Sequence, residues 1–119
     1  MGLLEFFRRA AAVAAACGLA GCATGAYEGK YDFSDGWRKA EVMEVKPLSQ
    51  LERPDFFSCV RHASSEQRAS GQFVVMKYLR MGKSVQHAQP LQPGQRWSAG
   101  DHVYVNLSDC KGEIVARSN

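Results

Sequence analysis

Apolar and polar residues alternate at every second position in several short stretches of this chain, a pattern typical of β-strands. The clearest stretch is residues 73–80, where apolar side chains fall on both faces: Phe73, Val75 and Leu79 on one, and Val74, Met76 and Tyr78 on the other. Because strands buried on both sides have apolar residues on both faces, this pattern predicts a central strand. Met81-Gly82 then predicts a turn, and residues 84–88 predict a weaker strand.

The segment before this strand predicts more elements. Residues 37–45 fit either a strand or a helix, and their β-branched content favours the strand. Residues 56–63 predict a second strand that contains Cys59. The polar residues 64–71 predict a mobile loop that joins two strands.

Two turn signals, Pro93-Gly94 and Gly100-Asp101, flank Trp97. Residues 102–107 alternate after them, which predicts a strand at an exposed edge of the sheet, and residues 113–117 predict a last short strand. This arrangement of glycines, one bulky residue and alternating valines resembles hairpins of SH3-like and OB-type barrels. Together these patterns predict an all-β fold, a small barrel or sandwich of five to six short antiparallel strands.

The N-terminal segment has a different composition. Residues 1–9 include Arg8 and Arg9, and residues 10–20 are apolar with no polar face and no charge. This run is far shorter than the ~20 residues that a membrane-spanning helix needs. A basic start followed by a short apolar run predicts a cleaved signal peptide.

The apolar run ends in Leu19-Ala20-Gly21-Cys22, which resembles the lipobox of bacterial lipoproteins. The resemblance implies cleavage before Cys22 and a diacylglyceryl thioether on its sulfur, with acyl chains such as palmitate. Two or more acyl chains hold a protein stably at a membrane. Because residue 23 is Ala, not Asp, the resemblance also implies the periplasmic face of the outer membrane in a Gram-negative host.

These patterns predict three parts of the chain: residues 1–21 as the signal peptide, 22–35 as the lipidated N-terminus and tether, and 36–119 as a periplasmic β-domain. Three aromatic residues, Tyr27, Tyr31 and Phe33, are many for a free tether. Residues 23–35 therefore fit a tether or an irregular first strand, and both interpretations stay open. The 98 residues after cleavage carry 13 Lys and Arg and 11 Asp and Glu. A net charge of +2 is mild and does not by itself indicate a polyanion-binding surface.

The four cysteines separate by position. Cys17 lies in the leader and Cys22 is the lipid acceptor, which leaves Cys59 and Cys110 as one pair. In an exported domain such a pair predicts a disulfide. The loop it closes is long enough for a stabilisation of ~4 kcal/mol by chain entropy. The spacing is not Cys-x-x-Cys, so no thioredoxin-type redox site is expected.

Candidate catalytic and metal-binding residues are few. His62, His87 and His102 lie in three separate segments, and none has a second ligand a few residues away, so we expect no metal site. No nucleophile elbow, zinc-protease motif or phosphate-binding loop is present, which favours a protein that is not an enzyme and needs no cofactor. An envelope hydrolase that uses His102 with Asp101 or Asp109 is the alternative, although Asp after Gly at a strand start is more often turn chemistry.

Binding residues are suggested by aromatic and basic side chains. Trp37 and Trp97 fit sugar stacking, although tryptophans in so small a domain more often fill the core. Lys77, Arg80 and Lys83 surround Tyr78, a basic and aromatic arrangement that suits lipopolysaccharide phosphates or anionic lipid headgroups in an exported protein. An ordinary solvated hairpin gives the same pattern.

We therefore expect a binding or scaffolding module of the cell envelope, held at the membrane by the lipid on Cys22. The residues expected at its contact surface are Trp97, Tyr104, Lys77, Tyr78, Arg80 and Lys83. The expected partners are an envelope protein, peptidoglycan or lipopolysaccharide, with no nucleic acid and no small-molecule cofactor. A lipid-anchored inhibitor of a lytic enzyme is a narrower form of the same hypothesis.

Overall fold

The computed structural model describes residues 26–117, so the predicted signal peptide, the lipobox and Cys22 lie outside the described residues. The chain divides into two compact units between Phe33 and Ser34. In the first unit, β1 (Ala26–Tyr27) and β2 (Tyr31–Asp32) pair antiparallel in a two-stranded sheet. Neither interpretation of residues 23–35 described this small hairpin. The residues on either side of this boundary belong to a 3-10 turn, η1 (Phe33–Asp35).

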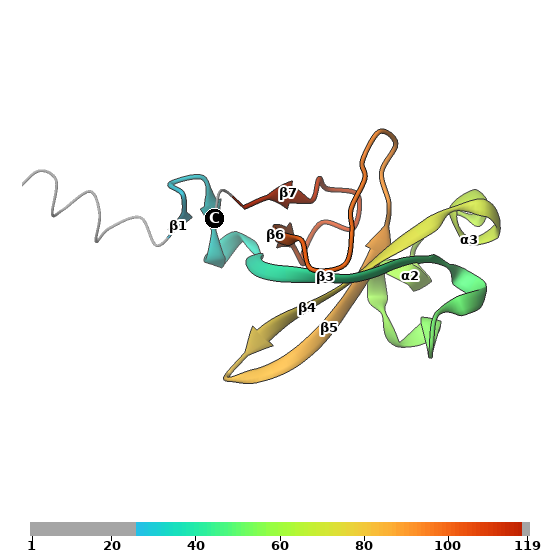
Figure 1. Ribbon diagram of the computed structural model, residues 1–119, viewed down its shortest axis with the longest axis horizontal. Coiled ribbons are helices and arrows are strands. Elements are labelled where there is room, and N and C mark those ends of the chain that lie inside the picture. Colours follow the sequence, from blue (N-terminus) through green and yellow to red (C-terminus); the bar gives the residue numbers. More distant parts are fainter. Residues whose placement is uncertain (1–25, 118–119) are drawn as a thin grey trace, which may run out of the picture. The chain divides into compact units, whose positions relative to one another are not determined.

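The second unit is built on one antiparallel sheet of five strands (Figure 1). The strands are β3 (Trp37–Pro47), β4 (Gln72–Arg80), β5 (Lys83–Pro90), β6 (His102–Asn106) and β7 (Val115–Ala116). Their order in space is β5-β4-β3-β6-β7, so β5 and β7 are its two edges and the sheet does not close into a barrel. The all-β class is confirmed, and so is the interior position of β4. The edge position expected of residues 102–107 is wrong, because β7 pairs with the outer side of β6.

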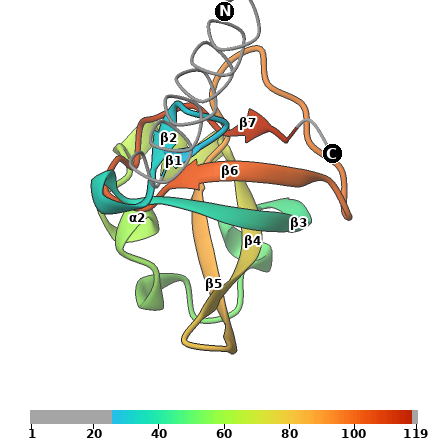
Figure 2. The same ribbon diagram turned by 90° about the vertical axis from the view of Figure 1, so that its left-hand side faces the viewer.

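Figure 2 shows β3 and β6 running together across β4 and β5, which makes the sheet strongly twisted. A β-bulge accompanies this change of direction. Val42 pairs with Met76 and Glu44 pairs with Val75, which leaves Met43 as the extra residue. On the N-terminal side of the bulge, residues 37–41 of β3 pair with β6.

Helical turns, and not a second strand, fill the stretch between β3 and β4 (Figure 1). They are η2 (Leu48–Gln50), η3 (Pro54–Phe56), α2 (Ser58–Arg61) and α3 (Ser65–Ser70). The strand predicted over residues 56–63 is therefore wrong. Phe57 and Val60 are three positions apart and pack in the same cluster, whereas a strand would point them to opposite faces.

The loop predicted over residues 64–71 is also wrong, because it contains α3. A capping box begins this helix: the Gln67 N–H donates to the Ser64 hydroxyl at 3.1 Å, and the Ser64 N–H donates to the Gln67 side chain at 3.0 Å. Ser-x-x-Gln is a known helix-start signal. Its four residues outweigh the polar composition that suggested a loop.

Two apolar clusters lie on the two faces of the sheet, and β4 belongs to both. Val74 and Met76 join one cluster with residues of β3 and β6 and with Ile114. Phe73 and Val75 join the other, which α2 and its neighbouring turns cover. Residues 73–80 therefore have apolar side chains on both faces because each face of β4 packs in a different cluster, as the sequence predicted.

The disulfide between Cys59 and Cys110 is present, as predicted. It joins α2 to the connection between β6 and β7, two regions that are 51 residues apart in sequence. Cys59 is buried beside Val60. The bond therefore holds the covering helix against the sheet.

Candidate binding surface

The β4–β5 hairpin ends in a two-residue turn. Arg80 pairs with Lys83 in the ladder, so Met81 and Gly82 form the loop, with φ angles of 52° and 79°. Two positive φ angles are typical of a type I′ turn, which follows the natural twist of a hairpin. Glycine adopts this conformation freely, but a left-handed methionine is strained by about 1 kcal/mol.

The end of this hairpin extends beyond its neighbour in the sheet. The last pair between β3 and β4 is Ala40 with Tyr78, after which β3 pairs only with β6. Residues 79–84 therefore continue as a ribbon of two strands, which projects from the sheet in Figure 1. We refer to residues 79–84 as the hairpin tip.

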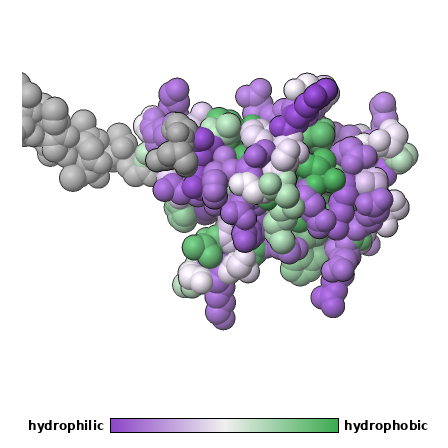
Figure 3. Space-filling view, viewed as in Figure 1, coloured by the Kyte–Doolittle hydropathy of each residue, from purple (hydrophilic) through white to green (hydrophobic). Residues whose placement is uncertain are grey.

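The hairpin tip exposes two large apolar side chains. Leu79 is 71% exposed and Met81 is 95% exposed. Small proteins expose single apolar residues commonly, but these two lie within three residues of each other at a projecting turn. In Figure 3, apolar and hydrophilic side chains lie side by side at this projecting end, at the lower left.

The charge of the hairpin tip is positive. Lys77, just before the tip, has its charge balanced by Glu41 on β3, with 3.3 Å between Nζ and Oε2. Arg80 and Lys83 are exposed, and among residues 26–117 no ion pair involves either of them. From residue 67 to residue 100 the sequence contains no Asp or Glu.

The six residues expected at the contact surface do not come together. Lys77, Arg80 and Lys83 share the outer half of the hairpin, as expected. Tyr78 is partly buried against the first apolar cluster. Tyr104 is 4% exposed, so its side chain is not part of the accessible surface.

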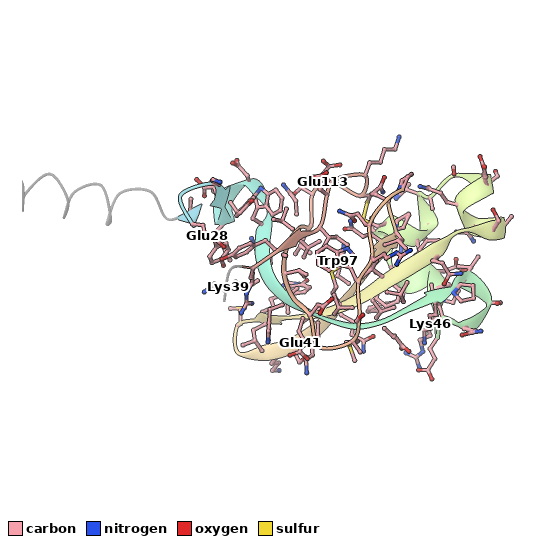
Figure 4. The ribbon with its side chains drawn as sticks, turned by 45° about the horizontal axis from the view of Figure 1, so that its top comes forward. Glu28, Lys39, Glu41, Lys46, Trp97 and Glu113 are labelled. Carbon is pink, nitrogen blue, oxygen red and sulfur yellow. A yellow bond between two sulfur atoms is a disulfide. The ribbon has the colours of Figure 1, made fainter. Side chains whose placement is uncertain are left out.

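Trp97 is also partly buried against the first cluster, where its indole N–H donates to the Gln95 side chain at 3.3 Å. Figure 4 labels Trp97 away from the hairpin tip. Trp97 borders an open groove of about 360 Å³ that Asp101, His102 and Arg117 also line. The groove combines an aromatic side chain with planar polar groups, the composition of many sugar-binding sites.

A second hollow, of about 140 Å³, lies between the sheet and the covering turns and is lined in part by Glu44, Lys46 and Glu52. Lys46 pairs with Glu44 across 2.8 Å. The cation in this hollow is therefore already partnered.

Sequence reasoning missed Leu79 and Met81 as surface residues. The alternating pattern placed Leu79 on the same buried face as Phe73 and Val75, because periodicity does not show where a covering layer ends. A methionine at a turn position between two basic residues was the signal available in the sequence.

The two aspartates considered for a hydrolase lie at opposite ends of β6, a strand of five residues. Asp101 accepts a hydrogen bond from the Ser98 N–H at 2.8 Å, and Asp109 accepts one from the Lys111 N–H at 3.1 Å. Both carboxylates therefore hold turns together.

Of the three histidines, His87 has the most enclosed imidazole. Its Nε2 donates to the Gln89 side chain at 2.9 Å, and the Gln89 amide donates to the Gly112 carbonyl at 3.2 Å. Burial lowers the pKa of His87 below its usual value, and the bond to Gln89 opposes this in part. Within the described part of the chain, no three His, Cys, Asp or Glu side chains group closely enough to hold a metal ion.

No protein-family model, no curated protein and no solved structure matches this chain. None of the helices in residues 26–117 has the length and apolar character needed to cross a membrane. The surface chemistry of the described residues is thus the basis for a functional hypothesis.

Proposed function

We propose that this chain is a small lipoprotein of the cell envelope, anchored through lipid on Cys22, whose folded domain is a binding module that contacts its partner through the hairpin tip. The location that goes with this proposal is the periplasmic face of the outer membrane in a Gram-negative host. The relation to SH3-like or OB-type barrels stays a hypothesis.

The observation that carries the proposal is the exposure of Leu79 and Met81 beside Arg80 and Lys83, two cations that form no ion pair with another residue among residues 26–117. A left-handed methionine is strained, and an apolar side chain in water gains nothing for folding. Residues that lower stability without packing are commonly kept for contact with a partner. The lipobox resemblance supports the envelope as the place of that contact.

A crosslinking pull-down of the tagged lipoprotein tests the proposal. The informative variant is Arg80→Glu with Lys83→Glu, and the matched control is Arg53→Glu with Lys111→Glu, which changes the net charge equally at exposed positions elsewhere. We expect one dominant envelope component with the wild type and the control and a loss of about tenfold or more with the tip variant. Equal recovery with all three proteins would contradict the proposal.

The anchor has its own test, the intact mass of protein extracted from membranes. The proposal expects a chain that begins at Cys22 and carries the added mass of acyl chains. A chain that begins at Met1, or an unmodified Cys22, would exclude a lipid anchor.

Peptidoglycan binding in the Trp97 groove is a second candidate, favoured by the composition of that groove. His102→Ala and Arg117→Ala would then lower the recovery of glycan fragments while the tip variant leaves it unchanged. Hydrolysis of the glycan by the wild type and its loss in His102→Ala would favour the hydrolase alternative. Recovery of a lytic enzyme would instead favour the inhibitor hypothesis.

A further inference from the structure

We propose that the partner of the hairpin tip is a lipid surface, the anionic bilayer that holds the lipid on Cys22. This inference rests on the proposed function and names the partner of the same site. The tip would insert Leu79 and Met81 among the headgroups while Arg80 and Lys83 bind phosphates, giving the domain a second attachment to the membrane.

The position of Leu79 and Met81 suits insertion into a bilayer. Met81 occupies the turn itself and is 95% exposed, so no described residue packs over its side chain. Leu79 follows two residues behind on β4, at 71% exposure. Side chains at a projecting turn enter the shallow boundary between headgroups and acyl chains without unfolding any strand.

The register of the hairpin places two cations side by side. Arg80 and Lys83 are directly paired across the turn. Like charges at paired positions repel and destabilise a hairpin. Among residues 26–117 no carboxylate pairs with either cation, so an external anion such as a lipid phosphate would relieve this repulsion.

Because the lipid on Cys22 would hold the domain close to the bilayer, even a weak contact of the hairpin tip with lipid would be enough to keep it there. The chain from Cys22 to Ser34, the first residue of the second unit, spans at most about 40 Å even when fully extended. A lipid on Cys22 would keep the domain within that distance of the bilayer. The tip would therefore experience a high effective concentration of lipid, and modest affinity would give a lasting contact.

A polarity-sensitive fluorophore on a single added cysteine tests the inference in the full lipidated chain. The probe is placed at Met81→Cys. The control is placed at Ser49→Cys, an exposed position in η2, which directly follows the C-terminal end of β3. The chains are reconstituted in vesicles of phosphatidylcholine alone or with phosphatidylglycerol added. We expect the emission from position 81 to shift to the blue in the anionic vesicles only, with no shift from position 49.

Adding Arg80→Glu and Lys83→Glu should abolish the shift, since each cation near an anionic surface contributes about 1 kcal/mol and their joint loss weakens binding about thirtyfold. High salt should reduce the shift in the wild type. Equal emission from positions 81 and 49 in both kinds of vesicle would overturn the inference. If the tip still recovers a protein in the pull-down, the proposed function holds with a protein as the partner; if that recovery also fails, both proposals fall.

Discussion

The two ends of the β4–β5 hairpin differ as much as any two regions of this protein. At one end Phe73 pairs with Pro90, both residues are buried, and Phe73 packs in the same cluster as Val60 of α2. At the other end Arg80 pairs with Lys83, and everything from Leu79 to Ser84 is exposed. The same two strands thus serve the core at one end and reach the solvent at the other.

This difference separates stability from binding along one element. The covered end fixes the hairpin in the sheet, so the tip can carry residues that do not help folding. A binding surface built in this way is ordered without being buried, which lowers the entropy lost on contact. Substitutions at the two ends should therefore have opposite consequences.

The largest effect is expected from Phe73→Ala compared with Leu79→Ala. The two residues lie on the same face of β4, but Phe73 is fully buried and Leu79 is 71% exposed. Phe73→Ala should lower the free energy of unfolding by about 3–5 kcal/mol, and Leu79→Ala should change it by less than about 0.5 kcal/mol. Urea denaturation measures both, and similar losses would break the comparison.

Removal of the disulfide should lower the stability of the whole domain without changing the exposed hairpin tip. Cys59→Ala with Cys110→Ala should lower the free energy of unfolding by about 4 kcal/mol, because the unfolded chain regains the freedom of a 51-residue loop. Chemical reduction of the wild type should give the same loss under denaturant. An unchanged midpoint would show that packing alone holds α2 to the sheet.

Met81→Asn tests whether the hairpin tip gives up stability for binding. Asn-Gly is the preferred sequence for this turn, and asparagine accepts a positive φ angle with less strain than methionine. We expect the free energy of unfolding to rise by about 1 kcal/mol while binding at the tip becomes weaker. A variant that gains stability and keeps full binding would remove Met81 from the contact surface.

The smallest expected effect is a pH dependence of the free energy of unfolding, which comes from His87 on β5. Burial lowers the pKa of His87 in the folded chain below its usual value of 6.5, so below this pH the unfolded chain binds the proton more readily. The free energy of unfolding should therefore fall as the pH drops below 6.5. His87→Gln should flatten this part of the pH profile, as followed by thermal unfolding at several pH values.

Sequence patterns predicted the parts of the fold that depend on local alternation. The strand over residues 73–80, the turn at Met81-Gly82 and the last strand near Val115 are all present, and so is the disulfide. The strand and the loop predicted over residues 56–70 are wrong. The helical spacing of Phe57 and Val60 and the capping box at Ser64 favour helices there, and these signals are stronger than polarity and β-propensity.

The candidate surface was predicted only in part. The basic residues Arg80 and Lys83 could be predicted, because their position on either side of the Met81-Gly82 turn is a property of the sequence alone. The exposure of Leu79 depends on where β3 stops pairing with β4, and the burial of Tyr104 depends on its packing. Both are tertiary properties that alternation along one strand does not contain.

The most direct test of the account is position-specific photocrosslinking in living cells, with a photoreactive residue at position 81 or at position 49 of the otherwise native chain. The account predicts an adduct with an envelope component from position 81, none from position 49, and loss of the adduct when Arg80 and Lys83 are both replaced by Glu. Adducts of equal yield from the two positions, or none from position 81, would contradict the claim that the hairpin tip is the binding surface.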